Sequence, residues 1–145
     1  MITFENEIVI NRPLEVVFAA VTDIPGWRRW QPGLLESRQT TPEPVGVGTK
    51  AVTVRANFGQ RFQIRVDVTE FVPNHLFAFR SVSAPITVKI RMTLTPVAGG
   101  TRLHQRTEGQ PHGFFRVAQP VLAYPLTKEM PDGLARLKVL LENQP

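Results

Sequence analysis

Apolar and polar side chains alternate with a period of two along much of the chain. The alternation is cleanest from Ile86 to Leu94, where apolar residues alternate with threonine, lysine and arginine. This period is typical of strands that have one buried and one solvated face. One such stretch covers residues 2–10, and six more follow from Leu34 to Glu108, joined by short turn sequences. Short strands joined by short turns predict an antiparallel meander.

Helical spacing replaces this alternation in two places near the first strand. Residues 14–21 carry apolar side chains at i, i+3, i+4 and i+7, which predicts one helix after Pro13. Trp27 and Trp30 lie three residues apart, so a second short helix around them would present both rings on one face. The sequence therefore predicts two short helices between the first and second strands.

The tail from Phe114 to Glu142 again has helical spacing, because its apolar residues recur every three or four positions. A helix of that length would be about 43 Å long, enough to cross seven strands about 34 Å wide. Pro120, Pro125 and Pro131 interrupt it, and each removes a helical hydrogen bond. We expect a kinked helix or two segments, with the main break at Pro131.

These elements predict an α+β helix-grip fold. A curved seven-stranded antiparallel sheet would wrap around a long C-terminal helix kinked by prolines, with two short helices after the first strand. The length of 145 residues fits one domain, residues 1–145, which is large enough to bury a core. Hydrophobic residues make up 42% and charged residues 20%, as in ordinary globular proteins.

The amino-acid composition excludes several classes of function for this protein. The chain has no cysteine, which excludes disulfides and cysteine-based zinc or thiol chemistry. The first residues have neither a basic region nor an apolar run, and no stretch approaches the ~20 apolar residues that span a bilayer. We therefore expect a soluble, cytoplasmic protein without a signal peptide.

Several short motifs accompany this order of elements: Pro13 with Val17-Phe18, Asp23 with Trp27 and Trp30-Gln31-Pro32, Gly46-Val47-Gly48-Thr49, Gly99-Gly100-Thr101-Arg102-Leu103, and Leu134-Ala135-Arg136-Leu137-Lys138. With them the chain resembles the START-like superfamily, also called the SRPBCC or Bet v 1-like fold. Within it the chain is most similar to small polyketide cyclase/dehydrase-like proteins. The resemblance covers nearly the whole chain, although the proline-broken final helix departs from the usual pattern. It implies a cavity for hydrophobic small molecules, lipids or quinones, and only some members are enzymes.

The apolar side of each strand predicts the wall of such a cavity. Ligand pockets are mostly apolar with a few placed polar groups, as this wall would be. The alternative is that the same side chains close-pack into a core. For Trp27 we favour a core plug, whereas Trp30 fits a plug or a ligand clamp equally well. The predicted ligand-binding residues are Trp30, Val54, Phe79, Ser81, Ile90, Met92, Gln105, Thr107, Phe115, Ala118 and Leu122.

Candidate catalytic groups are scarce. A cyclase or dehydratase needs an acid or base inside the pocket with a shifted pKa. The predicted wall contains no Asp, Glu, Lys or His; Glu70 and Glu108 come closest, and a register slip of one residue would reverse every face. His112, in the loop before the final helix, is the histidine best placed to touch a substrate. The three histidines lack metal-ligand spacing, so we expect no metal and no cofactor.

The net charge is +5. Basic residues gather on the polar side of the strands, and only Asp67 and Glu108 are expected to add negative charge on that side. Such a face could attract nucleic acid or an anionic membrane. No aromatic residues interleave with these charges, so we favour a solvated face. The basic residues are Arg55, Arg61, Arg65, Arg80, Lys89, Arg91, Arg102 and Arg106.

The leading prediction is therefore the binding, with transport as an open extension, of a hydrophobic small molecule such as a lipid, a quinone or a polyketide-like aromatic. A cyclase/dehydratase-type enzyme and an interaction protein that uses the basic face are the alternatives. The oligomeric state is left open, with a homodimer as one arrangement.

Overall fold

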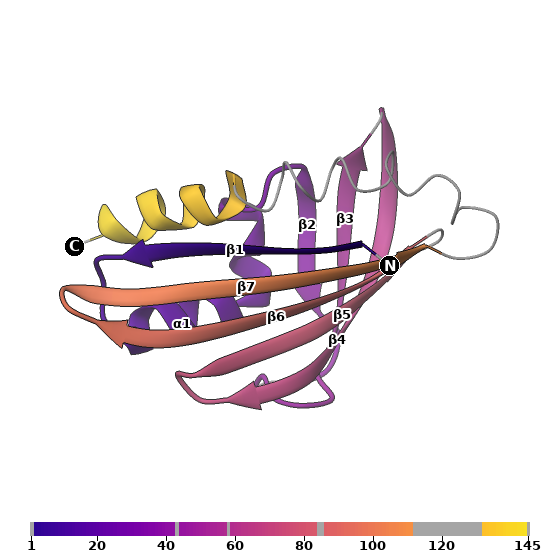
Figure 1. The fold of residues 1–145 in the computed structure, drawn as a ribbon. Coiled ribbons are helices and arrows are strands. Elements are labelled where there is room, and N and C mark those ends of the chain that lie inside the picture. The colour runs from indigo at the N-terminus through magenta and orange to yellow at the C-terminus, as the bar shows by residue number, and fades with distance from the viewer. Residues whose placement is uncertain (1, 43, 58, 84–85, 112–131, 145) are drawn as a thin grey trace.

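Seven strands form one curved antiparallel sheet in the order β1-β7-β6-β5-β4-β3-β2 (Figure 1). The structure, a computed structural model, describes residues 2–42, 44–57, 59–83, 86–111 and 132–144. Two helical elements follow the first strand, as the apolar spacing predicted. The bounds are β1 Ile2–Ile10, α1 Leu14–Thr22, the 3-10 helix η1 Ile24–Arg29, β2 Leu34–Gln39, β3 Lys50–Asn57, β4 Gln60–Val72, β5 Leu76–Ser83, β6 Ile86–Val97 and β7 Gly100–Pro111. The predicted α+β helix-grip fold is confirmed.

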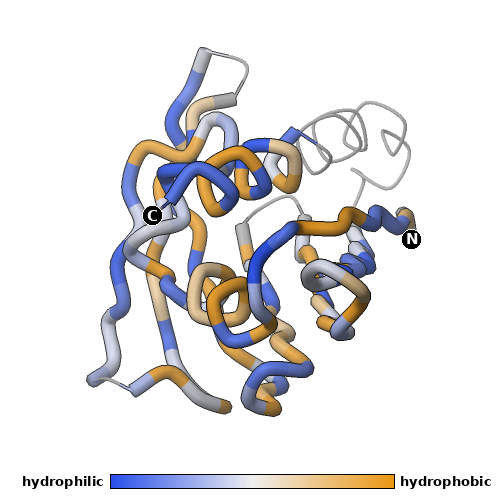
Figure 2. Tube along the Cα trace, turned by 90° about the vertical axis from the view of Figure 1, so that its left-hand side faces the viewer, coloured by the Kyte–Doolittle hydropathy of each residue, from blue (hydrophilic) through white to orange (hydrophobic). Residues whose placement is uncertain are grey.

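Residues 132–142 are helical and lie along β1 (Figure 1). Leu134, Leu137 and Leu141 are buried to within 3% exposure, so the predicted apolar stripe faces the core. Hydrophobic and hydrophilic positions accordingly alternate along this helix (Figure 2). A Cβ added at Gly133 would lie 3.5 Å from Pro32 Cδ, which shows how closely the helix approaches the segment after η1. Pro120, Pro125 and Pro131 lie outside the described residues, and the kink stays a prediction.

An aromatic cluster joins η1 to the sheet. The ring of Trp27 lies 4.9 Å from Phe79 and 6.4 Å from Phe77, measured between centroids. Its Nε1 donates a hydrogen bond to the carbonyl oxygen of Val21 at 2.9 Å. A buried Trp combines large apolar burial with a satisfied N–H in this way. Trp27 is 2% exposed and therefore plugs the core, as we favoured.

Arg12, in the turn after β1, fastens the end of the C-terminal helix. Its Nη1 donates to the carbonyl oxygens of Leu141 at 2.6 Å and Gln144 at 3.3 Å. Its own carbonyl oxygen accepts a hydrogen bond from Thr101 Oγ1 at 2.9 Å. The last carbonyls of a helix lack partners within it and carry partial negative charge, which a guanidinium satisfies. Arg12 thus links the end of β1 to β7 through its backbone and to the helix end through its side chain.

The outer face of the sheet carries interleaved charges. Asp67 is paired with Lys50 and Arg80, at 3.2 and 3.3 Å. Burial raises the pKa of Asp67, but the hydrogen bonds and charges of these two cations together outweigh it and leave the pKa below its ordinary value. Further pairs join Arg91 to Glu70, Arg102 to Glu7, His104 to Glu5, and Arg106 to both Glu5 and Glu108. The expectation that only Asp67 and Glu108 oppose the basic residues is therefore wrong, because β1 and the end of β4 bring further carboxylates to this face.

Replacing Arg12 with alanine should destabilise the fold. The helix-end carbonyls lose a charged donor, and we expect the free energy of unfolding to fall by about 1–3 kcal/mol. Urea denaturation followed by circular dichroism measures this. Arg28→Ala, at an exposed arginine of η1, is the matched control and should change stability by less than about 0.5 kcal/mol. Equal effects of the two substitutions would contradict the role of Arg12.

Glu142 should make stability depend on pH. The backbone N–H of Asn11 and the Lys138 ammonium, at 2.8 and 2.6 Å, lower the pKa of this carboxyl. Its contribution is fully present above the usual pKa of about 4.3 and is lost as the pH falls through the lowered value. Glu142→Gln should therefore be less stable than the parent protein at pH 7, by a margin that vanishes at low pH. A difference between the two proteins that stays constant down to low pH in the same denaturation series would contradict this role of Glu142.

Candidate functional site

The inner face of the sheet brings together most of the predicted ligand-binding residues that the structure describes. Cross-strand register aligns Phe79 with Ile90 and Ile90 with Thr107, and Met92 with Gln105. All five are buried, with Thr107 completely so. Ser81 is partly buried and lies opposite the buried Val66 and Val88, which places it on the same face.

The prediction that Val54 lines the inner face is wrong, because its side chain lies on the outer face. Val54 pairs with the exposed Gln63, whereas its neighbour Thr53 is 4% exposed and pairs with Ile64. Apolar or small residues occupy both sides of β3, so alternation alone could not identify the buried side. The inner side of β4 is bulky, and β3 meets it with the small side chains of Ala51 and Thr53.

The same reversal brings Arg55 to the inner side, contrary to the prediction that it belongs to the outer basic face. Its Nη1 donates to the carbonyl oxygen of Pro32 at 2.9 Å, and its Nη2 donates to Gln31 Oε1 at 2.6 Å. Arg55 is the only ionisable side chain on the inward-facing strand positions that the structure describes. These contacts hold the segment after η1 against β3.

A row of small side chains crosses the inner face beside the aromatic cluster. Register aligns one residue from each of five neighbouring strands, and none is larger than valine. We call these residues the small-residue row: Ala51, Val66, Ser81, Val88 and Gly109. One end of the inner face is therefore filled by large aromatic rings, while the adjoining part is built from short side chains.

Two neighbouring strands, β1 and β7, each place on the inner face a buried polar atom that has no hydrogen-bond partner among the residues that the structure describes. These atoms are Asn6 Nδ2 and Thr107 Oγ1, and register sets Asn6 opposite Gln105 and Thr107 opposite Phe4. A third such atom, Gln39 Oε1, belongs to β2 at the opposite edge of the sheet.

Asn6 was missed in the sequence, although the signal was present. An amide stands there at the position where the alternation of β1, with Phe4 and Ile8 on either side, calls for an apolar residue. A polar side chain on the apolar side of a strand is a reason to look for a partner, and none is found for its Nδ2 among the described residues.

Four predicted site residues, His112, Phe115, Ala118 and Leu122, lie outside the described residues, so their roles stay predictions. Within the described ranges, no cluster of three or more metal-ligating side chains occurs. None of the helices in those ranges is long and apolar enough to cross a bilayer.

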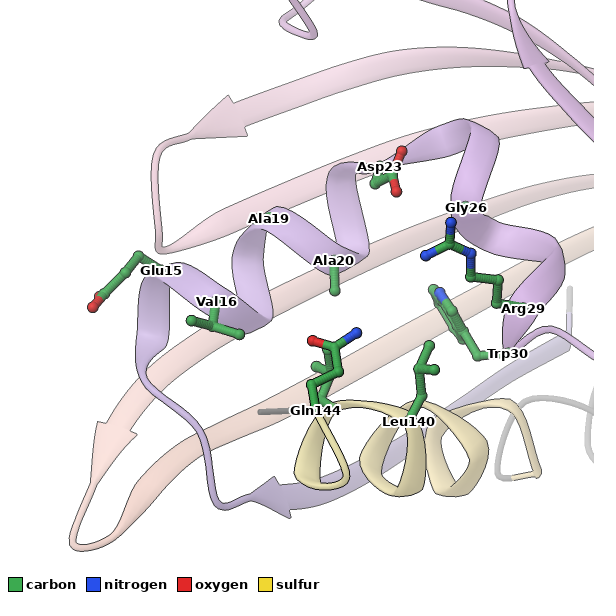
Figure 3. Close-up of a pocket in the computed structure, with 11 residues that line it drawn as sticks. Glu15, Val16, Ala19, Ala20, Asp23, Gly26, Arg29, Trp30, Leu140 and Gln144 are labelled. Carbon is green, nitrogen blue, oxygen red and sulfur yellow. The ribbon is translucent and has the colours of Figure 1, made fainter.

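A separate pocket of about 380 Å³ lies between α1, η1 and the C-terminal helix (Figure 3). Trp30 and Leu140 point toward one another across it, and Trp30 is 4% exposed. Of the predicted site residues that the structure describes, only Trp30 lines this pocket. Its apolar lining is edged by exposed polar side chains. The lining residues are Glu15, Val16, Ala19, Ala20, Asp23, Gly26, Arg29, Trp30, Leu140, Leu141 and Gln144.

Comparisons with known proteins identify a family from the sequence and a fold from the structure. The family model described as "Polyketide cyclase / dehydrase and lipid transport" matches residues 1–142. A search of curated protein sequences finds no match. Among solved structures, protein TTHA0849 from Thermus thermophilus is similar with a TM-score of 0.81 and 15% identity over 97% of each chain.

Two further structures widen this comparison. The di-domain ARO/CYC protein StfQ of the steffimycin biosynthetic pathway has a TM-score of 0.80 and 13% identity over 97% of this chain and 50% of its own. Ara h 8.0201 has a TM-score of 0.72 and 14% identity over 99% of each chain. Identities this low establish the fold alone, whereas the family model covers nearly the whole sequence. The chain therefore belongs to the polyketide cyclase/dehydrase and lipid transport family and has the SRPBCC, or Bet v 1-like, fold.

Proposed function

We propose that this protein binds a hydrophobic small molecule, such as a lipid, a quinone or a polyketide-like aromatic, against the inner face of the sheet. The observation that carries the proposal is the composition of that face. Its buried side chains are apolar, with a few hydroxyl and amide groups between them, which is the usual character of a small-molecule pocket. The family to which the chain belongs, whose description includes lipid transport, supports the same function.

The small-residue row is the proposed seat of the ligand. Trp27 already covers Phe79 at 4.9 Å, so that end of the inner face is occupied by protein. Beyond it, Ser81 contributes only a hydroxymethyl group, and Gly109 has no side chain. A ligand lying there would remove apolar surface from water at about 25 cal/mol per Å², before the costs of binding are subtracted.

Binding is favoured over cyclase or dehydratase chemistry by the charges of this face. A proton-transfer catalyst needs a titratable group within about 2.6–3.2 Å of the reacting atom. On the inward-facing positions described, the one ionisable group is Arg55, which is hydrogen-bonded to Gln31 and Pro32. His112 is the remaining candidate acid or base and lies outside the described residues. A catalytic role for His112 therefore stays a prediction.

Native mass spectrometry of freshly purified protein, with analysis of its organic extract, tests the proposal directly. We expect a co-purifying hydrophobic compound that is displaced by N-phenylnaphthylamine, a neutral fluorescent probe of apolar sites. A protein that carries no compound and binds no probe would contradict the proposed function.

Replacing Ser81 with phenylalanine should block the site, because the new ring would occupy the middle of the small-residue row. We expect the affinity for N-phenylnaphthylamine, measured by fluorescence titration, to fall by about tenfold or more. Val82→Phe is the matched control, since the adjacent side chain points to the outer face, and should bind as the parent protein does. Equal affinities of the two variants would place the probe away from the inner face.

A further inference from the structure

We infer that the inner face contains a hydrogen-bonding subsite, formed by Asn6 of β1 and Thr107 of β7, that recognises an acceptor oxygen on a neutral apolar ligand. The inference rests on the proposed function and names the chemistry that the bound molecule must carry.

The first observation is that two polar groups are buried without partners on one face. Thr107 is 0% exposed, and Nδ2 of Asn6 is buried as well. Neither Thr107 Oγ1 nor Asn6 Nδ2 has a hydrogen-bond partner within the described part of the chain. Buried polar groups are almost always hydrogen-bonded, because leaving one unpaired costs its desolvation energy. Gln105 lies directly opposite Asn6 and is the inward position next to Thr107 on β7, but it is not counted with them because it has an interaction of its own. Two such unpaired groups on neighbouring strands indicate that a bound ligand supplies the atom to which they hydrogen-bond.

The second observation is their relative placement. Thr107 pairs with Phe4, and Asn6 is the next position of β1 on the same face, so the two are diagonal neighbours. Diagonal neighbours lie about 7–8 Å apart at their Cβ atoms or somewhat closer, which an amide and a hydroxyl side chain are long enough to bridge through one shared atom. One oxygen atom between them can therefore accept two hydrogen bonds of about 2.9 Å.

The subsite also borders the proposed seat of the ligand. Gly109 of the small-residue row is the next inward position after Thr107 along β7, and Ile90 lies opposite Thr107 on β6. A ligand on the row would thus have an apolar body against Val88 and Ile90 and one polar atom against the subsite.

Donor chemistry defines the class of ligand. An amide Nδ2 only donates, and a threonine hydroxyl donates or accepts, so one acceptor oxygen satisfies both. A carboxylate would also need a compensating cation when buried. Among the described inward-facing residues, Arg55 is the only cation, and it belongs to β3, four strands from β7. The structure therefore favours a neutral ketone, quinone or ester carbonyl.

Fluorenone and fluorene test the subsite, because they share a tricyclic skeleton and differ in one carbonyl oxygen. We expect the parent protein to bind fluorenone about 5- to 10-fold more tightly than fluorene in equilibrium dialysis. Thr107→Val keeps the shape of the side chain and removes the hydroxyl, so this preference should shrink severalfold. Thr53→Val, at another buried threonine of the inner face, should leave the preference intact.

The melting temperature of the ligand-free protein separates recognition from a structural role. Thr107→Val removes an unpaired buried hydroxyl and should not lower the melting temperature. Thr101→Val removes a hydroxyl that donates to the carbonyl oxygen of Arg12 and should lower it. Equal losses in the two variants would overturn the inference. Equal affinity of the parent protein for fluorenone and fluorene would also overturn the inference, but it would not contradict the proposed function. If neither probe nor N-phenylnaphthylamine binds, the proposed function fails as well.

Discussion

The packing of Trp27 against Phe77 and Phe79 is the contact on which the rest of the arrangement depends. It holds η1 against the sheet and, because the indole N–H is bonded to Val21, it also fixes the end of α1. Each large ring buries on the order of 150–250 Å², so this cluster dominates its end of the core. Its position divides the inner face into a part filled by aromatic rings and a part built from small side chains. The proposed ligand site is a consequence of that division.

The C-terminal helix is held against this frame at two places. Gly133 lies against the segment after η1, where a Cβ would be 3.7 Å from the carbonyl oxygen of Trp30. At the other end, Arg12 binds the last carbonyls, and a Cβ at Gly100 would collide with the carbonyl oxygen of Ile10. Backbone segments from β1 and β7 therefore meet closely beneath the helix end. Together with the hydrogen bond from Lys138 Nζ to the carbonyl oxygen of Val9, these contacts hold the described part of the helix against the sheet.

The sequence predicted the order of elements well, because periods of two and of three to four residues are properties of the chain itself. It also identified the buried side of β6, where only one side is apolar, and of β7, where the other side carries the charged Arg102, Arg106 and Glu108. It failed at β3, because Val52 and Val54 compete with Ala51 and Thr53 for the core. That choice is decided by the bulky residues of β4 opposite, which is tertiary information. Arg55 was misplaced for the same reason, and its partners Gln31 and Pro32 lie more than twenty residues away.

Charge completes the distinction between the two faces of the sheet. Exposed ion pairs add little stability, typically about 0–1 kcal/mol each, so those of the outer face are not what holds the fold together. Their effect is to place a carboxylate beside several of the arginines, which weakens the positive potential that a nucleic acid or an anionic membrane would require. The inner face is neutral where it is described, apart from the engaged Arg55. Because Asn6 and Thr107 carry neighbouring buried polar atoms that find no partner among the described residues, the recognition proposed for this face depends on hydrogen bonding rather than on charge.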